Sequence, residues 1–213
     1  MPKPEIIGSL RSTYVRAVCI VCEEKEIDYV LTEKRLHAPE ILALHPFGKM
    51  PVLRHGDFAV CESKAIATYL DRSFPGVQVI PSDARRAALT EQWVSLVNTV
   101  IDVTLIRTYL LSYIFPKTAD GKPDRKLIDG VTPALREQLG ILDKAVAKTG
   151  YLVDDQFTFA DINLLPILYY IRLFPEGAEA LAAASHLAGY YDRHTERPSL
   201  RNTVPPAGPP SRA

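Results

Sequence analysis

Three short stretches of the sequence place reactive or polar residues where a strand pattern gives way to a helix pattern or a turn. Ser12 follows the apolar run PEIIGSL, and Pro51 opens the run PVLRH. The pair Glu62-Ser63 stands between FAVC and KAIATYL. A helix N-terminus offers unpaired amides and a partial positive charge, which suit a carboxylate, while Glu62 can face an ammonium group. The chemistry indicated is the binding of a small neutral or zwitterionic ligand.

Each stretch also has a simpler interpretation. Proline inside a strand-like run marks an edge, a first position or a turn, and Ser12 or Glu62-Ser63 can serve as plain helix caps. An X-Pro bond can instead be held cis, which would turn the backbone of Met50 toward a peptide-like ligand lying as an extra strand. The three stretches together favour the ligand role over capping alone.

The overall composition limits the class of protein and the kinds of binding partner that the sequence is compatible with. The 213 residues are 47% hydrophobic and 23% charged, which is typical of a globular protein. Lysine plus arginine and aspartate plus glutamate each number 25, so no net charge favours nucleic acid or an anionic membrane. The N-terminus has no apolar signal segment, and three cysteines fit a reducing compartment. We expect a cytoplasmic protein that binds neither nucleic acid nor membrane.

The first third of the chain must supply the elements that position these residues. Strands are predicted at PEIIGSL, at DYVLTEKRL and in the two halves of MPVLRHGDFAVCES, which are joined by a turn around Gly56-Asp57. Helical segments are predicted at STYVRAVCIVCEEKEI, APEILALHP and SKAIATYLDRSF, and Pro75-Gly76 ends the last of them. The predicted order is β-α-β-α-β-β-α, an α/β domain over residues 1–75 with a small mixed sheet.

Beyond Pro81 the pattern is helical throughout. Apolar spacing predicts helices at 83–115, 130–149, 158–174 and 179–198. We therefore predict a linker at 76–82, an all-α helical bundle domain at 83–203 and a proline-rich, disordered tail at 204–213.

Two motifs have structural interpretations. Cys19 and Cys22 match a redox spacing, but they lie inside the first helix on its apolar face, so we interpret them as packing residues. No His-x-x-x-His or second cysteine pair completes a set of metal ligands. In FTFADI, Thr158 and Asp161 have the spacing of a capping box at a helix start, which favours a structural rather than a catalytic role for Asp161.

The motifs taken in chain order resemble those of a known family. Ser12 and Arg16 after Gly8, then HPFGKMPVL, ESKAIATYLD and FTFADINLL, are similar in order and spacing to cytosolic glutathione transferases over residues 4–200. The serine-type classes phi, theta and zeta are the most similar. The resemblance implies a thioredoxin-like N-terminal domain that binds glutathione and an all-helical C-terminal domain that forms most of the acceptor site.

The resemblance also implies a reaction and a set of roles. Glutathione is the co-substrate, no metal is needed, and the thiol is activated as a thiolate that attacks a small hydrophobic electrophile. Ser12 would stabilise the thiolate, with Tyr14, two residues away, as the alternative. The remaining glutathione-binding residues would be His37 and Lys49 at the glycine carboxylate, Met50 and the cis Pro51 at the cysteinyl backbone, and Glu62 and Ser63 at the γ-glutamyl end.

Further expectations concern the acceptor pocket and the oligomeric state. Tyr109, Tyr113 and Phe115 are predicted to line the acceptor pocket, with core packing as the alternative for each. Phe47, on the loop HPFG, is predicted to insert into a second subunit of a homodimer. The same fold also serves glutathione-dependent isomerases, peroxidases and disulfide reductases, and non-catalytic binding modules, which remain alternatives.

Overall fold

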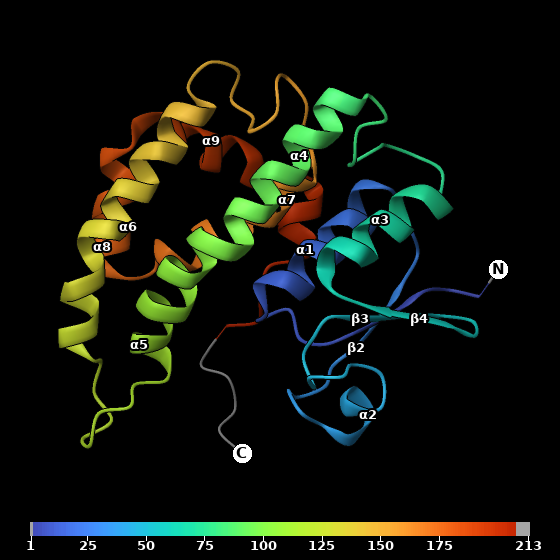
Figure 1. Cartoon of the computed structure of the whole chain (residues 1–213), viewed down its shortest axis with the longest axis horizontal. Coiled ribbons are helices and arrows are strands. Elements are labelled where there is room, and N and C mark those ends of the chain that lie inside the picture. The colour runs from blue at the N-terminus through green and yellow to red at the C-terminus, as the bar shows by residue number, and fades with distance from the viewer. Residues whose placement is uncertain (1, 208–213) are drawn as a thin grey trace. The chain divides into compact units, whose positions relative to one another are not determined.

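The strand-like runs near the N-terminus pair into one mixed sheet in the computed structural model, which describes residues 2–207 (Figure 1). The spatial order is β2-β1-β3-β4. β1 pairs parallel with β2 and antiparallel with β3, and β3 pairs antiparallel with β4. The bounds are β1 (Glu5–Ile7), β2 (Val30–Thr32), β3 (Val52–His55) and β4 (Phe58–Cys61).

Helices cover both faces of this sheet: α1 (Thr13–Glu24), α2 (Pro39–Leu42) and α3 (Ser63–Ser73). Ile7 and Val52 pack with Ile41 of α2. Their strand neighbours Ile6 and Leu53 alternate to the opposite face, where α1 and α3 contact the strands and each other (Figure 1). The order β-α-β-α-β-β-α and the thioredoxin-like arrangement are as predicted.

The segment predicted as a linker is fixed to the first unit. The side chain of Lys25 is buried, and its Nζ lies 3.3 Å from an Asp71 oxygen and 2.9 Å from the carbonyl oxygen of Val77. The same carboxylate accepts from the amides of Val79 and Ile80. These contacts hold the chain against the sheet domain up to residue 80.

One long helix opens the second unit. It runs without a break from Ala84 to Ile114, and its middle is π-helical: α4 (Ala84–Leu96), η1 (Val97–Ile101), η2 (Val103–Leu110) and α5 (Leu111–Ile114). By length and composition alone it could cross a membrane. The buried core helix of a globular protein passes the same test, and 44% of its most apolar window is buried.

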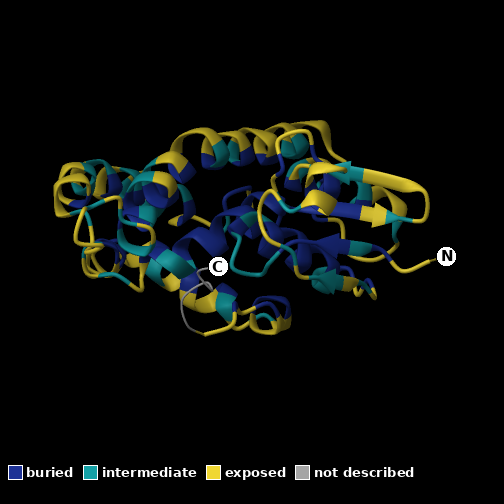
Figure 2. Ribbon diagram, turned by 90° about the horizontal axis from the view of Figure 1, so that it is seen from below, coloured by how far each residue is buried: buried dark blue, intermediate teal, exposed yellow. Residues whose placement is uncertain are grey.

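Helices also form the rest of the second unit: α6 (Arg125–Val146), α7 (Phe159–Ile171), α8 (Pro175–Ala183) and α9 (Ser185–Thr195). α7 is apolar on nearly every side and is buried for most of its length. Figure 2 shows burial along the whole ribbon. The capping box at its start is confirmed, because the Thr158 side chain accepts a backbone amide while Asp161 accepts the amide of Thr158.

The division of the chain differs from the predicted boundaries. Contacts separate Ala84–His194 from a unit formed by the described residues of Met1–Asp83 and Thr195–Ala213. The last helix, α10 (Pro198–Asn202), packs on α1, where the Arg16 guanidinium donates to the carbonyl oxygen of Leu200 at 3.2 Å. The predicted helical domain ran to residue 203. Within the predicted tail, residues 208–213 lie outside the described part of the chain.

The packing interpretation of the two helical cysteines is confirmed. Cys19 and Cys22 are both fully buried in α1. Burial raises the pKa of the Cys19 thiol to about 12 and that of Cys22 well above its ordinary value. Both therefore remain protonated thiols at neutral pH.

Candidate functional site

The pairing register brings the three polar stretches to one end of the sheet. The last residue of β1 pairs with the first residue of β3, which in turn pairs with the last residue of β4. The loop that carries Ser12 leaves the sheet directly after β1, Pro51 directly precedes β3, and Glu62 directly follows β4. Residues that are distant in sequence thereby leave neighbouring strands at the same edge.

Ser12 is the N-cap of α1. Its backbone is extended, and its Oγ accepts from the amide of Val15 at 3.4 Å. This contact uses a lone pair, and the described part of the chain supplies no acceptor for the proton of the hydroxyl. Tyr14 lies half-buried in the first turn of α1. The Ser12 hydroxyl thus stands at the positive end of a helix with a proton to donate.

The loop before β3 approaches the loop before α1 closely. The peptide bond between Met50 and Pro51 is cis, as predicted. A Cβ atom at Gly8 would lie 3.2 Å from the Cβ of Met50 and 2.5 Å from a methyl group of Val15. Only glycine fits there, and its absence of a side chain lets the Met50 backbone and the start of α1 lie side by side.

Glu62 is the residue before α3 and has a backbone that side-chain-bearing residues rarely adopt, with φ at 73°. Its side chain makes no capping hydrogen bond and is 71% exposed. Ser63, the first residue of α3, is buried. The N-terminus of α3, with its partial positive charge, and the exposed carboxylate of Glu62 together offer partners for both charges of a zwitterion.

Two basic side chains extend the same edge. The amide of His37 donates to the carbonyl oxygen of Gly48 at 2.9 Å, which closes the loop around α2. Gly48 has φ at 62°, and a Cβ there would lie 2.5 Å from Nδ1 of His37. His37 and Lys49 are both exposed, so a carboxylate in solution can reach either.

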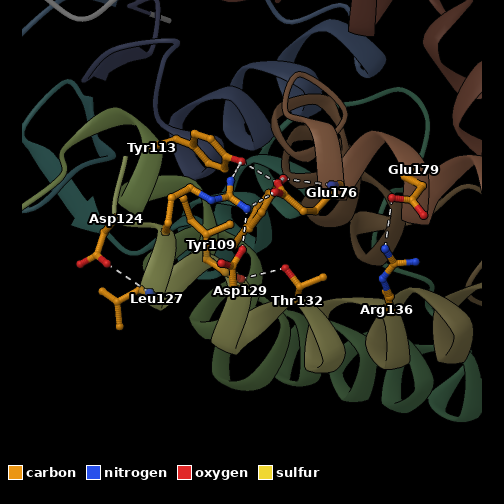
Figure 3. A network of polar contacts seen from close by, with 12 residues as sticks. Tyr109, Tyr113, Asp124, Leu127, Asp129, Thr132, Arg136, Glu176 and Glu179 are labelled. Carbon is orange, nitrogen blue, oxygen red and sulfur yellow. Dashed lines mark hydrogen bonds and ion pairs between the residues drawn. The ribbon is translucent and has the colours of Figure 1, made fainter. Parts of the chain in front are cut away.

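The residues predicted for the acceptor pocket belong to the second unit, where two of them share one carboxylate (Figure 3). The hydroxyls of Tyr109 and Tyr113 donate to Oε2 of Glu176 at 3.1 and 2.6 Å. Arg125 donates to Oε1 of Glu176 at 2.8 Å and to the Tyr113 hydroxyl at 2.9 Å. The Tyr109 hydroxyl also accepts from the amide of Gly177.

The charges in this cluster follow from its hydrogen bonds. Partial burial opposes ionisation of Glu176, but donors from Tyr113 and Arg125 outweigh it and lower the pKa of the carboxyl to about 2. Burial and the adjacent carboxylate raise the pKa of Tyr109 and of Tyr113. The tyrosines are therefore protonated donors fixed to an anion, and Tyr109 is fully buried.

Phe115 differs from the two tyrosines because its side chain is 51% exposed. It lies on the wall of a hollow of about 320 Å³ at the C-terminal end of the long helix. Most of its surface is apolar, although five of the eight lining residues are polar or charged: Arg107, Thr108, Leu111, Ser112, Phe115, Lys117, Asp124 and Leu127.

Sequence reasoning missed His45 and Glu176. His45 was interpreted only as part of the loop that carries Phe47, yet it is 2% exposed and lies 3.4 Å from Glu62. Glu176 follows Pro175 at a helix start, a local signal, but nothing local shows that tyrosines 63 and 67 residues away reach it. Among residues 2–207, no group of three His, Cys, Asp or Glu side chains is placed to hold a metal ion.

Known proteins resemble this chain over most of its length. Residues 6–78 match the family described as glutathione S-transferase, N-terminal domain, and residues 103–198 match the corresponding C-terminal domain. The chain is 30% identical to glutathione S-transferase 3 of Zea mays, with 97% of each chain covered. It is also 30% identical to glutathione S-transferase GstB of Escherichia coli strain K12, covering 92% of this chain and 95% of the relative.

A solved structure agrees with these matches. The glutathione S-transferase of Methylobacillus flagellatus KT, solved with GSH bound, is similar to this chain with a TM-score of 0.81 and 27% identity. The similarity covers 95% of this chain and 100% of that one.

Proposed function

The chain belongs to the glutathione S-transferase family, and from this premise we propose that Ser12 activates the thiol of bound glutathione. The protein is a glutathione transferase, an enzyme that transfers the glutathionyl group. The observation that carries the proposal is the Ser12 hydroxyl, which caps α1 with its lone pair and keeps its proton for a ligand.

Glutathione is held, in this proposal, by the groups at the sheet edge. Glu62 receives the γ-glutamyl ammonium, and the amides at the start of α3 with Ser63 receive the γ-glutamyl carboxylate. The backbone of Met50, before Pro51, pairs with the cysteinyl residue. His37 and Lys49 attract the glycine carboxylate. These contacts leave the sulfur beside Ser12.

The reaction then follows from thiol chemistry. A cysteine thiol has a pKa of about 8.5, so most of it is protonated and poorly nucleophilic at neutral pH. Donation from Ser12, together with the positive end of α1, favours the thiolate, and the thiol proton passes to water. The sulfur forms a bond to an electrophilic carbon, and the leaving group departs with its electron pair. Holding both reactants makes this step effectively intramolecular.

For the acceptor, the proposal assigns direct contact to Phe115 and a supporting role to Tyr109 and Tyr113. Phe115 offers an exposed aromatic face in a mostly apolar hollow. Because both tyrosine hydroxyls donate to Glu176, they support the shape of the long helix and do not offer a proton to the acceptor. A small hydrophobic electrophile fits this surface, and detoxification of such compounds is the corresponding physiological role.

A two-fold homodimer is part of the proposal. Phe47 is 70% exposed on its loop, and an apolar ring of that size is unfavourable in water. The long helix also leaves four large apolar side chains exposed at intervals of seven, four and three residues: Leu89, Leu96, Val100 and Val103. Sedimentation of the purified protein should give a dimer at micromolar concentration, and Phe47→Glu should shift it toward monomer. A monomeric wild type would contradict the assembly.

A cytoplasmic location is supported by cysteine chemistry. All three cysteines are free thiols, and Cys61 is partly exposed. Unpaired thiols persist in a reducing compartment. Fractionation of the native host would test the location directly.

The test of Ser12 is the pH profile of conjugation to a generic aryl halide. Ser12→Ala removes a hydrogen bond to a charged sulfur, so conjugation at neutral pH should fall about ten- to a hundredfold and recover partly as pH rises. Ultraviolet titration of bound thiolate should show the same rise in thiol pKa. Tyr14→Phe is the control and should keep the wild-type profile. If Tyr14→Phe loses the activity and Ser12→Ala keeps it, the tyrosine is the activating group.

A further inference from the structure

His45 is a buried side chain next to the proposed glutathione-binding edge, and the proposed function assigns it no role. It lies three residues after the end of α2, and its own amide donates to the carbonyl oxygen of Ile41 at 2.7 Å. The imidazole is 2% exposed, although most histidines on loops are solvated. A polar ring buried in this way needs partners for both of its nitrogens.

The hydrogen bond at Nδ1 of His45 shows which ring nitrogen carries the proton. Nδ1 accepts from the amide of Phe47 at 3.0 Å. Because a backbone amide only donates, Nδ1 carries no proton and the neutral ring has its proton on Nε2. Nε2 lies 3.4 Å from Oε1 of Glu62, so this proton is within electrostatic reach of the carboxylate.

The carboxylate of Glu62 needs a nearby donor to have a defined orientation. Its side chain is largely in water and makes no capping bond, and a glutamate in that state samples several rotamers. A donor to Oε1 restricts these rotamers and leaves Oε2 for a second partner. A neutral donor also leaves the negative charge of the carboxylate in place, whereas lysine or arginine at the same position would compete with a cationic ligand.

We infer that His45 is a positioning residue for Glu62: its Nε2–H fixes the carboxylate that receives the γ-glutamyl ammonium of glutathione. This inference rests on the proposed role of Glu62. It adds a residue that contacts no part of glutathione and acts through one that does. The same ring holds the amide of Phe47, so a single side chain orders both the loop and the carboxylate.

The experiment separates these two tasks of His45 with two substitutions. His45→Asn keeps an acceptor for the Phe47 amide, because an asparagine oxygen accepts readily from the amide two residues on, but it is too short to reach Glu62. His45→Ala loses both contacts. His186→Asn is the matched control, since it makes the same change in the second unit, at an exposed histidine paired with Asp143.

His45→Asn should raise the KM for glutathione about three- to tenfold, with kcat at saturating glutathione within about twofold of wild type. Glu62→Gln should raise the same KM, and the double variant should be no worse than Glu62→Gln, because the two residues act in one contact. Affinity for S-hexylglutathione should fall in His45→Asn, while affinity for its N-acetyl derivative, which lacks the ammonium, should not. His186→Asn should match wild type.

Two results would overturn the inference about His45 while leaving the proposed role of Glu62 in place. If Glu62→Gln raises KM but His45→Asn does not, Glu62 binds glutathione without help from His45. If the penalty of His45→Asn persists in full in the Glu62→Gln background, the histidine acts through the loop alone. If Glu62→Gln leaves KM unchanged, the proposed role of Glu62 fails, and the inference fails with it.

Discussion

Both units of the protein place hydroxyl and acidic residues at the starts of helices, and they use these residues differently. In the sheet unit, Ser12 caps α1 and Glu62 precedes α3. In the helical unit, Thr158 and Asp161 form the capping box of α7. The residue types are alike, so the difference must come from burial and from the number of partners.

The helical pair is saturated with partners. Asp161 is fully buried and accepts from the amides of Leu152 and Thr158 and from the hydroxyls of Thr158 and Tyr190. Glu62 has an exposed carboxylate with one neutral neighbour, and Ser12 keeps its proton. A saturated acid stabilises the fold, whereas an unsaturated one at a helix start is available to a ligand. Four substitutions and one change of pH test this distinction through the free energy of unfolding.

Asp161→Asn should have the largest effect. The amide keeps only one acceptor oxygen and presents an NH₂ group to buried donors, so at least one donor loses its partner. We expect the free energy of unfolding, measured by urea denaturation at neutral pH, to fall by about 2–5 kcal/mol. A loss below about 1 kcal/mol would mean that the fold does not depend on Asp161 and its hydrogen bonds, which would contradict the distinction between the two units.

The pH dependence of stability should come next. Burial, outweighing the hydrogen bonds, raises the pKa of Asp161 from 3.8 to about 6. Between these values the folded protein holds a proton that the unfolded chain has lost, so the free energy of unfolding falls as pH rises, by up to about 3 kcal/mol. The difference between wild type and Asp161→Asn, which does not titrate, should therefore shrink between about pH 4 and pH 7. A constant difference would contradict the prediction.

The two capping hydroxyls should differ by a smaller amount. Thr158 is fully buried and both accepts and donates, so Thr158→Ala should lower the free energy of unfolding by about 1–2 kcal/mol. Ser12 makes one long contact at a partly exposed position, so Ser12→Ala should cost about 0.5–1 kcal/mol. Equal losses would show that Ser12 is as fully committed to capping as Thr158.

Glu62→Gln should have the smallest effect on stability. Its side chain is exposed and caps no amide, so the free energy of unfolding should change by less than about 0.5 kcal/mol while glutathione binding weakens. Thermal unfolding with and without glutathione separates the two effects. A large loss of stability without ligand would place Glu62 in the structural class with Asp161.

Elements with strong local signals could be predicted from the sequence. The Gly56-Asp57 turn, the strand alternation and the stop at Pro75 are enough for the order of the sheet unit, and the spacing of Thr158 and Asp161 is enough for the capping box. The sequence also predicted that Ser12, Pro51 and Glu62 act together. Their shared edge follows from the strand register.

Other features depend on contacts between distant residues. Gly130 and Pro133 weaken the helical pattern, so the start of α6 at Arg125 was missed, although Asp124 caps it through the amide of Leu127. The π-helical middle of the long helix has no sequence signature at this level. The role of His45 depends on a carboxylate 17 positions further along the chain, and only the folded loop brings them together.

The packing of α10 on α1 affects when the sheet unit can fold during synthesis. Arg16 and Glu24 lie in α1, yet their buried charged groups bond to α10 and its flanking residue: Arg16 to Leu200, and Glu24 to Arg197 and Ser199. A ribosome makes α1 more than 170 residues before these partners. The sheet unit therefore cannot reach its final packing until residues 197–200 have emerged, even though its strands emerge early. The helical unit, contiguous in sequence, has all its residues available sooner.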